Sequence, residues 1–145
     1  MYKILITTDG SEQSKKSVEE AIKIASPMGK GVEIIVVFVM ESIDSIIYAP
    51  DLDGSLQKQI ANTQDAFAAE TTKKVEKDIS SKGIKVRSKI LLGHPVDQIC
   101  SFAEKEKCNL IIMGKKRRGK LEEFIAGSVS VQVVNRAKTN VLVIK

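Results

Sequence analysis

The chain has 145 residues, 43% of them apolar, which suits a single domain with a substantial hydrophobic core over residues 1–145. No apolar run reaches the roughly 20 residues of a membrane span, and the first residues lack the long apolar region of a signal peptide, so we expect a cytoplasmic protein. The net charge of +5 is modest, and 4% aromatic residues without tryptophan argue against a surface that stacks nucleic-acid bases.

The first third of the chain alternates between strand and helix patterns. Residues 3–8 contain a short apolar run, as in a strand that is buried on both faces. Residues 14–26 repeat apolar side chains at helical spacing, and residues 32–40 are rich in valine and isoleucine, which predicts a helix and then a second strand. Residues 41–55 are irregular and contain several turn residues.

The rest of the chain continues this alternation. Residues 56–81 predict a long helix whose sparse apolar positions leave much of its circumference in water. There follow a strand at 84–92, a helix after Gly93-His94-Pro95, a strand at 110–113, a helical region over 121–137 and a strand at 140–144. Strands separated by helices imply right-handed crossovers, so we expect a three-layer open α/β sandwich with a mostly parallel five-stranded sheet.

Candidate binding residues lie where the predicted strands end. Asp9, Val39 and Gly114 each stand at the carboxyl end of a strand. Ligands of parallel sheets settle outside these ends, at the point where the strand order reverses. The three residues are therefore expected to converge on one rim of the sheet.

The stretch from Gly114 to Ser128 is the most informative part of the chain. A buried strand ends in glycine, and a second glycine, Gly127, precedes a hydroxyl that opens a helix. Amides at a helix start, beside a glycine that admits a ligand, form a natural seat for phosphate. Five of the six residues 115–120 are basic. We rank the roles of this basic loop as solvated loop, phosphate contact and nucleic-acid contact, in descending order.

Catalytic groups are few. Cys100, Cys108 and the single histidine His94 form no recognisable metal or redox motif, which favours free thiols. The chain also lacks a GxxxxGK[ST] phosphate loop and an obvious general base beside the phosphate seat. At most a slow hydrolysis of ATP by bound water is expected.

Over essentially its whole length the chain resembles the universal stress protein family. The resemblance is carried by Ile4-Leu5-Ile6-Thr7-Thr8-Asp9-Gly10-Ser11, Gly93-His94-Pro95, Ile111-Ile112-Met113-Gly114, Gly127-Ser128-Val129-Ser130 and Asn140-Val141-Leu142-Val143-Ile144. It implies an open sandwich of the adenine nucleotide alpha hydrolase-like type. It also implies a homodimer paired through the C-terminal strand, here residues 141–144.

The resemblance further implies a site for ATP or AMP, with Mg²⁺ held through the phosphates. Family members that bind ATP carry Gly-x2-Gly-x9-Gly-Ser/Thr, of which Gly114, Gly127 and Ser128 match three positions. Arg117 stands where the second glycine belongs, and Gly119 substitutes for it only if the loop shifts. By the same resemblance Asp9 faces ribose and Val39 faces adenine. The remaining candidates are Met113 before the first glycine, and Val129 and Ser130 at the phosphates.

Arg117 leaves two functions open. A side chain where glycine is needed costs about 1 kcal/mol and crowds the ligand, whereas a guanidinium in a permissive loop clamps phosphate oxygens. The first case predicts a stress-response interaction protein with a blocked pocket, and the second a dimeric regulator that binds ATP or AMP. Each candidate also has a purely structural explanation: helix caps for Asp9 and Ser128, turns for the glycines and core packing for Val39.

Overall fold

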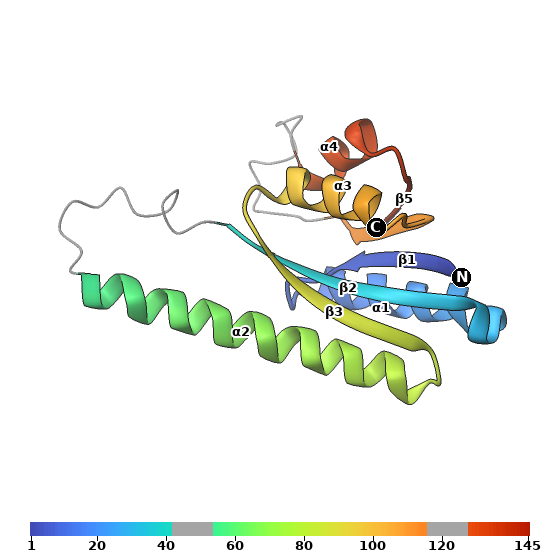
Figure 1. Ribbon diagram of the computed structural model, residues 1–145, viewed down its shortest axis with the longest axis horizontal. Coiled ribbons are helices and arrows are strands. Elements are labelled where there is room, and N and C mark those ends of the chain that lie inside the picture. Colours follow the sequence, from blue (N-terminus) through green and yellow to red (C-terminus); the bar gives the residue numbers. More distant parts are fainter. Residues whose placement is uncertain (42–53, 116–127) are drawn as a thin grey trace.

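The computed structural model describes residues 1–41, 54–115 and 128–145 (Figure 1). Its elements confirm the predicted alternation, and they add one short 3₁₀ helix. In chain order they are β1 (Tyr2–Thr7), α1 (Glu12–Ala25), the 3₁₀ helix η1 (Ser26–Gly31), β2 (Val32–Met40), α2 (Gly54–Ser81), β3 (Lys85–Leu92), α3 (Pro95–Lys105), β4 (Leu110–Gly114), α4 (Val129–Arg136) and β5 (Asn140–Ile144). The first part of the helical region predicted over 121–137 lies outside the described residues.

The five strands form one sheet in the order β3-β2-β1-β4-β5. Every pair of neighbouring strands is parallel, which confirms the predicted sheet. The chain builds outward from β1 to β3 on one side and then from β4 to β5 on the other. The order therefore reverses between β1 and β4, and their carboxyl ends flank the expected ligand crevice.

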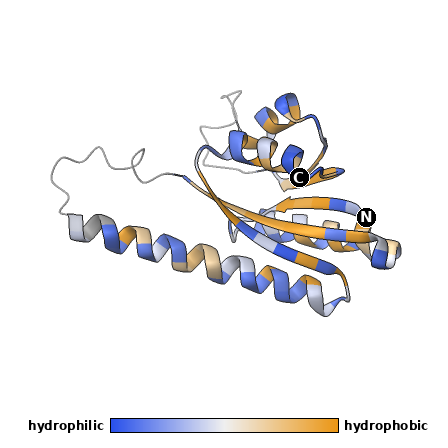
Figure 2. Ribbon diagram, in the orientation of Figure 1, coloured by the Kyte–Doolittle hydropathy of each residue, from blue (hydrophilic) through white to orange (hydrophobic). Residues whose placement is uncertain are grey.

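Alternate side chains of the central strands enter two separate cores. Ile4 and Ile6 pack with α1 and α2 on one face, while Leu5 packs with α3 and α4 on the other. All three side chains are completely buried, as the short apolar run predicted. Figure 2 shows β1 and β2 as mostly apolar strands and α2 as a mostly polar helix. The predicted three-layer sandwich is thus the observed one.

Helix α1 begins and packs as its sequence indicates. Ser11 is the N-cap, and its side chain accepts a hydrogen bond from the amide of Ser14. Such a cap stabilises a helix by about 1 kcal/mol. Val18, Ala21 and Ala25 form the buried stripe of α1. The first turn of α1 is thereby fixed beside the end of β1.

Helix α2 is the longest element, and it packs along β2 and β3 (Figure 1). Ala68 and Ile79 are buried, and most of the helix faces water, as predicted. Phe67, one of the few apolar residues of the helix, is 52% exposed. Its ring contacts Phe38 of β2 edge-to-face, with centroids 6.0 Å apart. This contact places α2 at the carboxyl rim of the sheet.

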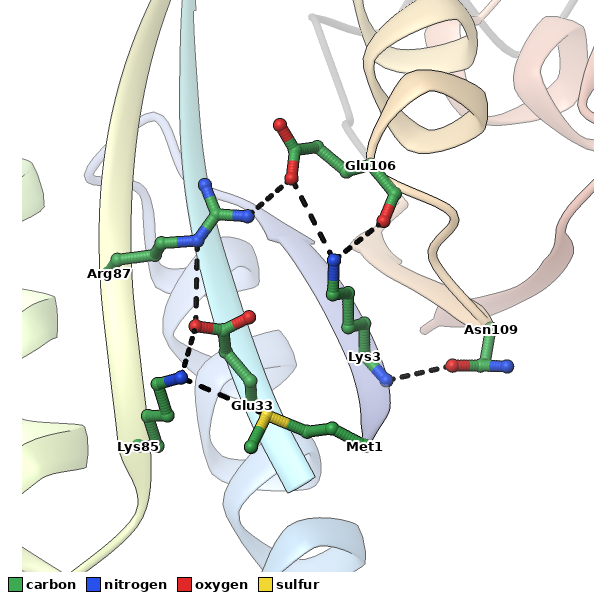
Figure 3. A network of polar contacts seen from close by, with 7 residues as sticks. All are labelled: Met1, Lys3, Glu33, Lys85, Arg87, Glu106 and Asn109. Atoms are coloured by element: carbon green, nitrogen blue, oxygen red, sulfur yellow. Dashed lines mark hydrogen bonds and ion pairs between the residues drawn. The ribbon is translucent and has the colours of Figure 1, made fainter. Parts of the chain in front are cut away.

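A network of charged side chains joins three strands to the end of α3 (Figure 3). Glu33 of β2 is 5% exposed, and its carboxylate pairs with Lys85 at 3.4 Å and with Arg87 at 3.5 Å. Arg87 also binds the carboxylate of Glu106, whose carbonyl oxygen accepts a hydrogen bond from Lys3 of β1. Nothing in the local sequence pattern indicated this network. It lies at the amino ends of the strands, opposite the rim of the expected ligand site.

Candidate functional site

A pocket of about 510 Å³ opens at the carboxyl ends of β1, β2 and β4, where the strand order reverses. It is thus a cleft at the position where open α/β sheets bind ligands. Its walls come from the strand ends and from all four α-helices. The lining residues are Thr7, Thr8, Asp9, Ser11, Gln13, Ser14, Phe38, Val39, Met40, Glu41, Thr63, Gln64, Phe67, Pro95, Ile99, Met113, Gly114, Val129 and Ser130.

The structure brings most of the predicted site residues to this pocket. Those that line it are Asp9, Val39, Met113, Gly114, Val129 and Ser130. Ser128 does not line it, but its hydroxyl lies 3.2 Å from that of Ser130. The other three candidates, Arg117, Gly119 and Gly127, lie outside the described residues.

The turn after β1 holds the Asp9 carboxylate at the rim. Its Oδ1 accepts a hydrogen bond from the amide of Ser11 at 2.9 Å. Such a bond from an aspartate to the amide two residues on stabilises a turn. Gly10 adopts φ +80°, and a Cβ there would lie 3.1 Å from the ring of Phe67. The turn therefore needs glycine both for its backbone angle and for the approach of α2.

Gly114 is required by packing and not by a left-handed turn, because its φ lies outside that region. A Cβ at Gly114 would lie 2.9 Å from the carbonyl oxygen of Gln13 and 3.0 Å from the carbonyl carbon. The first turn of α1 thus rests directly on the end of β4. This contact fixes how closely α1 approaches β4 at the rim.

The start of α4 presents polar groups to the same rim. Ser128 is its N-cap, and the Ser128 hydroxyl accepts a hydrogen bond from the amide of Val131 at 3.4 Å. The amides of Val129 and Ser130 lie in the first turn of α4, where backbone amides find no carbonyl acceptor within the helix. Amides at the start of a helix favour anionic groups. The start of α4 therefore adds amide donors and the Ser130 hydroxyl to this rim of the pocket.

The two cysteines are free, as predicted. Burial raises the pKa of the Cys108 thiol to about 11, and burial also raises the pKa of the Cys100 thiol. Both thiols are therefore protonated at neutral pH and are weak nucleophiles. Among the residues that the structure describes, no cluster of three His, Cys, Asp or Glu side chains could hold a metal ion. None of the helices in this part combines the length and apolarity needed to cross a bilayer.

Some lining residues were not foreseen from the sequence. Phe38 directly precedes Val39 in β2. Because successive side chains of a strand point to opposite faces of the sheet, this position alone would have placed Phe38 at the same rim but on the other face. Gln13 and the α2 residues Thr63, Gln64 and Phe67 have no such local signal. Their position depends on how α1 and α2 pack against the sheet.

These features define an open parallel α/β sandwich with its ligand pocket at the switch point of the sheet. The model of the Universal stress protein family matches residues 1–145, and the chain belongs to this family. The family resemblance and the fold class drawn from the sequence are both confirmed.

Individual relatives agree with this assignment. Over 143 residues the chain is 34% identical to universal stress protein MJ0531 of Methanocaldococcus jannaschii, covering 99% of this chain and 81% of the relative. The solved structure of MJ0577 from the same organism superimposes with a TM-score of 0.81 at 27% identity, covering 99% of this chain and 95% of the other. A universal stress protein from Archaeoglobus fulgidus, solved in complex with dAMP, shares the fold with a TM-score of 0.69 at 21% identity. The match covers 100% of this chain and 98% of the other.

Proposed function

We propose that this protein is a cytoplasmic stress-response regulator that binds an adenine nucleotide, ATP or AMP, at the carboxyl rim of its sheet. One observation carries the proposal. Every predicted site residue within the described part of the chain, apart from Ser128, lines one pocket at the point of strand reversal. The complex of a family member with dAMP supports the choice of ligand class.

The chemistry of the pocket suits the three parts of a nucleotide. Val39 provides apolar surface for adenine, and the Asp9 carboxylate provides acceptors for ribose hydroxyls. The amides that begin α4, together with the hydroxyl of Ser130, suit phosphate oxygens. The volume of about 510 Å³ falls within the usual range of small-molecule sites. Mg²⁺ would bind through the phosphates and water.

The proposal is tested by equilibrium titration of the purified protein with labelled ATP and AMP, with Mg²⁺ present. We expect saturable binding below millimolar nucleotide. We also expect Arg117→Gly to weaken ATP binding about tenfold, because a guanidinium beside phosphate makes charge-assisted hydrogen bonds. Arg118→Gly, in the same loop, is the matched control and should cause a smaller loss. The absence of binding at millimolar nucleotide would reject the proposal.

A second function rests on the same arginine. Since Arg117 replaces a motif glycine, the pocket could be closed to nucleotide and the protein could act through other proteins. In that case wild-type protein binds no ATP, and Arg117→Gly creates binding. The titration above separates the two functions, because Arg117→Gly has opposite effects on affinity in each.

We further propose that two copies of the chain pair through residues 141–144. Strand β5 is an edge of the sheet, and edge strands offer unpaired backbone groups to a partner. Beside it, α4 exposes Val131 and Val134, of which 48% and 50% are accessible. These two side chains would be covered when the partner packs against this edge.

For the dimer we expect Val134→Glu to weaken association at least tenfold, since the charge would lie in an apolar contact. Light scattering coupled to size-exclusion chromatography, over a dilution series, measures the change. Leu92→Glu is the matched control, because Leu92 is 63% exposed at the end of β3, the opposite edge of the sheet. Equal dissociation of both variants, or of neither, would contradict this interface.

A further inference from the structure

Phe67 of α2 is a large apolar side chain that stands exposed at the pocket. It is 52% exposed, whereas the next residue of the helix, Ala68, is completely buried. Single exposed apolar residues are common on protein surfaces. Phe67, however, also lines the pocket at the switch point of the sheet. Because small-molecule pockets are lined mainly by apolar and aromatic side chains, an accessible ring at this place suits an apolar surface of the ligand.

Two contacts hold the Phe67 ring in place without a ligand. Phe38 meets it edge-to-face, with centroids 6.0 Å apart and the ring planes at 79°. Gly10 lies so close that a Cβ there would stand 3.1 Å from Cζ, at the tip of the Phe67 ring. An edge-to-face contact covers at most one face of each ring. The ring is therefore positioned by its neighbours and still accessible, so little ordering is needed when a ligand binds.

The pocket extends over the carboxyl end of β2. Phe38 and Val39 are successive residues of this strand, so their side chains point to opposite faces of the sheet. Both nevertheless line the same pocket, and so does Phe67. The cavity therefore passes over the strand end from one face to the other. A flat group above that end can contact Val39 and the ring of Phe67 together.

The order of the strands indicates which part of a nucleotide this flat group is. The start of α4, proposed for phosphate, belongs to a helix that packs on β5, and β5 is next to β4. Asp9, proposed for ribose, follows β1. Strand β2 lies on the far side of β1 from β4. Phosphate, ribose and base thus follow one another across the strand ends, and the base reaches β2 and α2.

We propose that Phe67 stacks against the base of the bound nucleotide, so that α2 forms one wall of the base subsite. Every base has a flat π face, and stacking on an aromatic side chain contributes strongly to binding. This inference rests on the proposed nucleotide site and adds a residue outside the family motif. Since Phe67 acts on the base, its effect on affinity should depend on the presence of a base.

The first test compares AMP with ribose 5-phosphate, which has the same sugar and phosphate but no base. In isothermal titration calorimetry Phe67→Ala should weaken AMP binding about tenfold, as expected for the loss of one stacking contact. The affinity for ribose 5-phosphate, measured by displacement of AMP, should stay unchanged. Phe67→Tyr keeps the aromatic face and should keep the affinity for AMP. Met28→Ala is the matched control, since Met28 is exposed in η1, which precedes the amino end of β2.

The second test uses the absence of tryptophan from the chain. In Phe67→Trp the protein contains a single indole, and a base stacked on that indole should quench its fluorescence. AMP should therefore lower the emission in a saturable manner, whereas ribose 5-phosphate should leave it unchanged. In Met28→Trp neither ligand should change the emission.

Three results would overturn the inference and leave the proposed function intact. They are equal affinities of wild-type protein and Phe67→Ala for AMP, an equal loss for AMP and ribose 5-phosphate in Phe67→Ala, and unchanged emission of Phe67→Trp at saturating AMP. No binding of AMP or ATP to wild-type protein would instead reject the proposed function.

Discussion

Replacing Gly114 with alanine is expected to destabilise the protein by about 2 kcal/mol and to weaken nucleotide binding at least tenfold. The new Cβ would lie 2.9 Å from the backbone oxygen of Gln13, so either the end of β4 or the first turn of α1 must move. Overpacking against backbone typically costs about 1–3 kcal/mol. The same movement displaces Asp9 and Gln13 at the crevice. Urea unfolding and nucleotide titration measure the two effects.

Gly31→Ala is the matched control for this substitution. Gly31 ends η1, its φ is not in the left-handed region, and a Cβ there would meet nothing within 4 Å. We expect its free energy of unfolding to stay within about 0.5 kcal/mol of wild type, with a slight gain from the less flexible unfolded chain. If Gly114→Ala is as stable as Gly31→Ala, close packing of α1 on β4 does not constrain this position.

The second large effect is expected for Glu33→Gln, which should lower the free energy of unfolding by about 2 kcal/mol. The Glu33 side chain is 7% exposed, and it faces two cations, Lys85 and Arg87. Glutamine keeps the shape and removes the charge, which leaves those cations less well paired. Because Lys85 and Arg87 are 60% and 39% exposed, water compensates in part, and the loss stays below that of a fully buried pair.

A double-mutant cycle isolates the pair itself. With Glu33→Gln and Arg87→Met, alone and combined, urea unfolding should give an interaction energy of about 1 kcal/mol. Glu12→Gln is the matched control, since Glu12 pairs with Lys15 on the surface with 84% of its side chain exposed. That substitution should change stability much less than Glu33→Gln does. Additive losses for Glu33 and Arg87 would show that the two residues are not coupled.

The fold was largely predictable, because local patterns report it directly. Uninterrupted apolar runs such as Ile4-Leu5-Ile6 occur where a strand is covered on both faces, and helical spacing marks the covering helices. The buried Glu33 was not predictable in the same way. Within a run of valine and isoleucine it looks like a polar interruption, and its partners come from β3, far along the chain.

The site was predictable in part, for a physical reason. Parallel strands end on one rim, so Asp9, Val39 and Gly114 could be brought together from strand ends alone. Gln13 and Phe67 could not, because the position of a helical side chain at the rim depends on how its helix packs. The reason for Gly114 was also hidden, since the atoms that exclude a side chain belong to α1.

Most residues that line the pocket lie outside the two cores, but Val39, Ile99, Met113 and Val129 belong both to the pocket and to the core under α3 and α4. This partial overlap affects how the family can diversify. Side chains in the middle of β1, β2 and β4 hold the layers together, whereas ligand selection falls to residues beyond the strand ends and on the first turns of helices. Mutations at rim residues outside the cores, such as Thr63 and Gln64, can therefore alter the pocket with little loss of folding stability, whereas mutations at Met113 or Val129 affect pocket and core together. Descendants of one ancestral scaffold can keep its architecture while their recognition chemistry drifts.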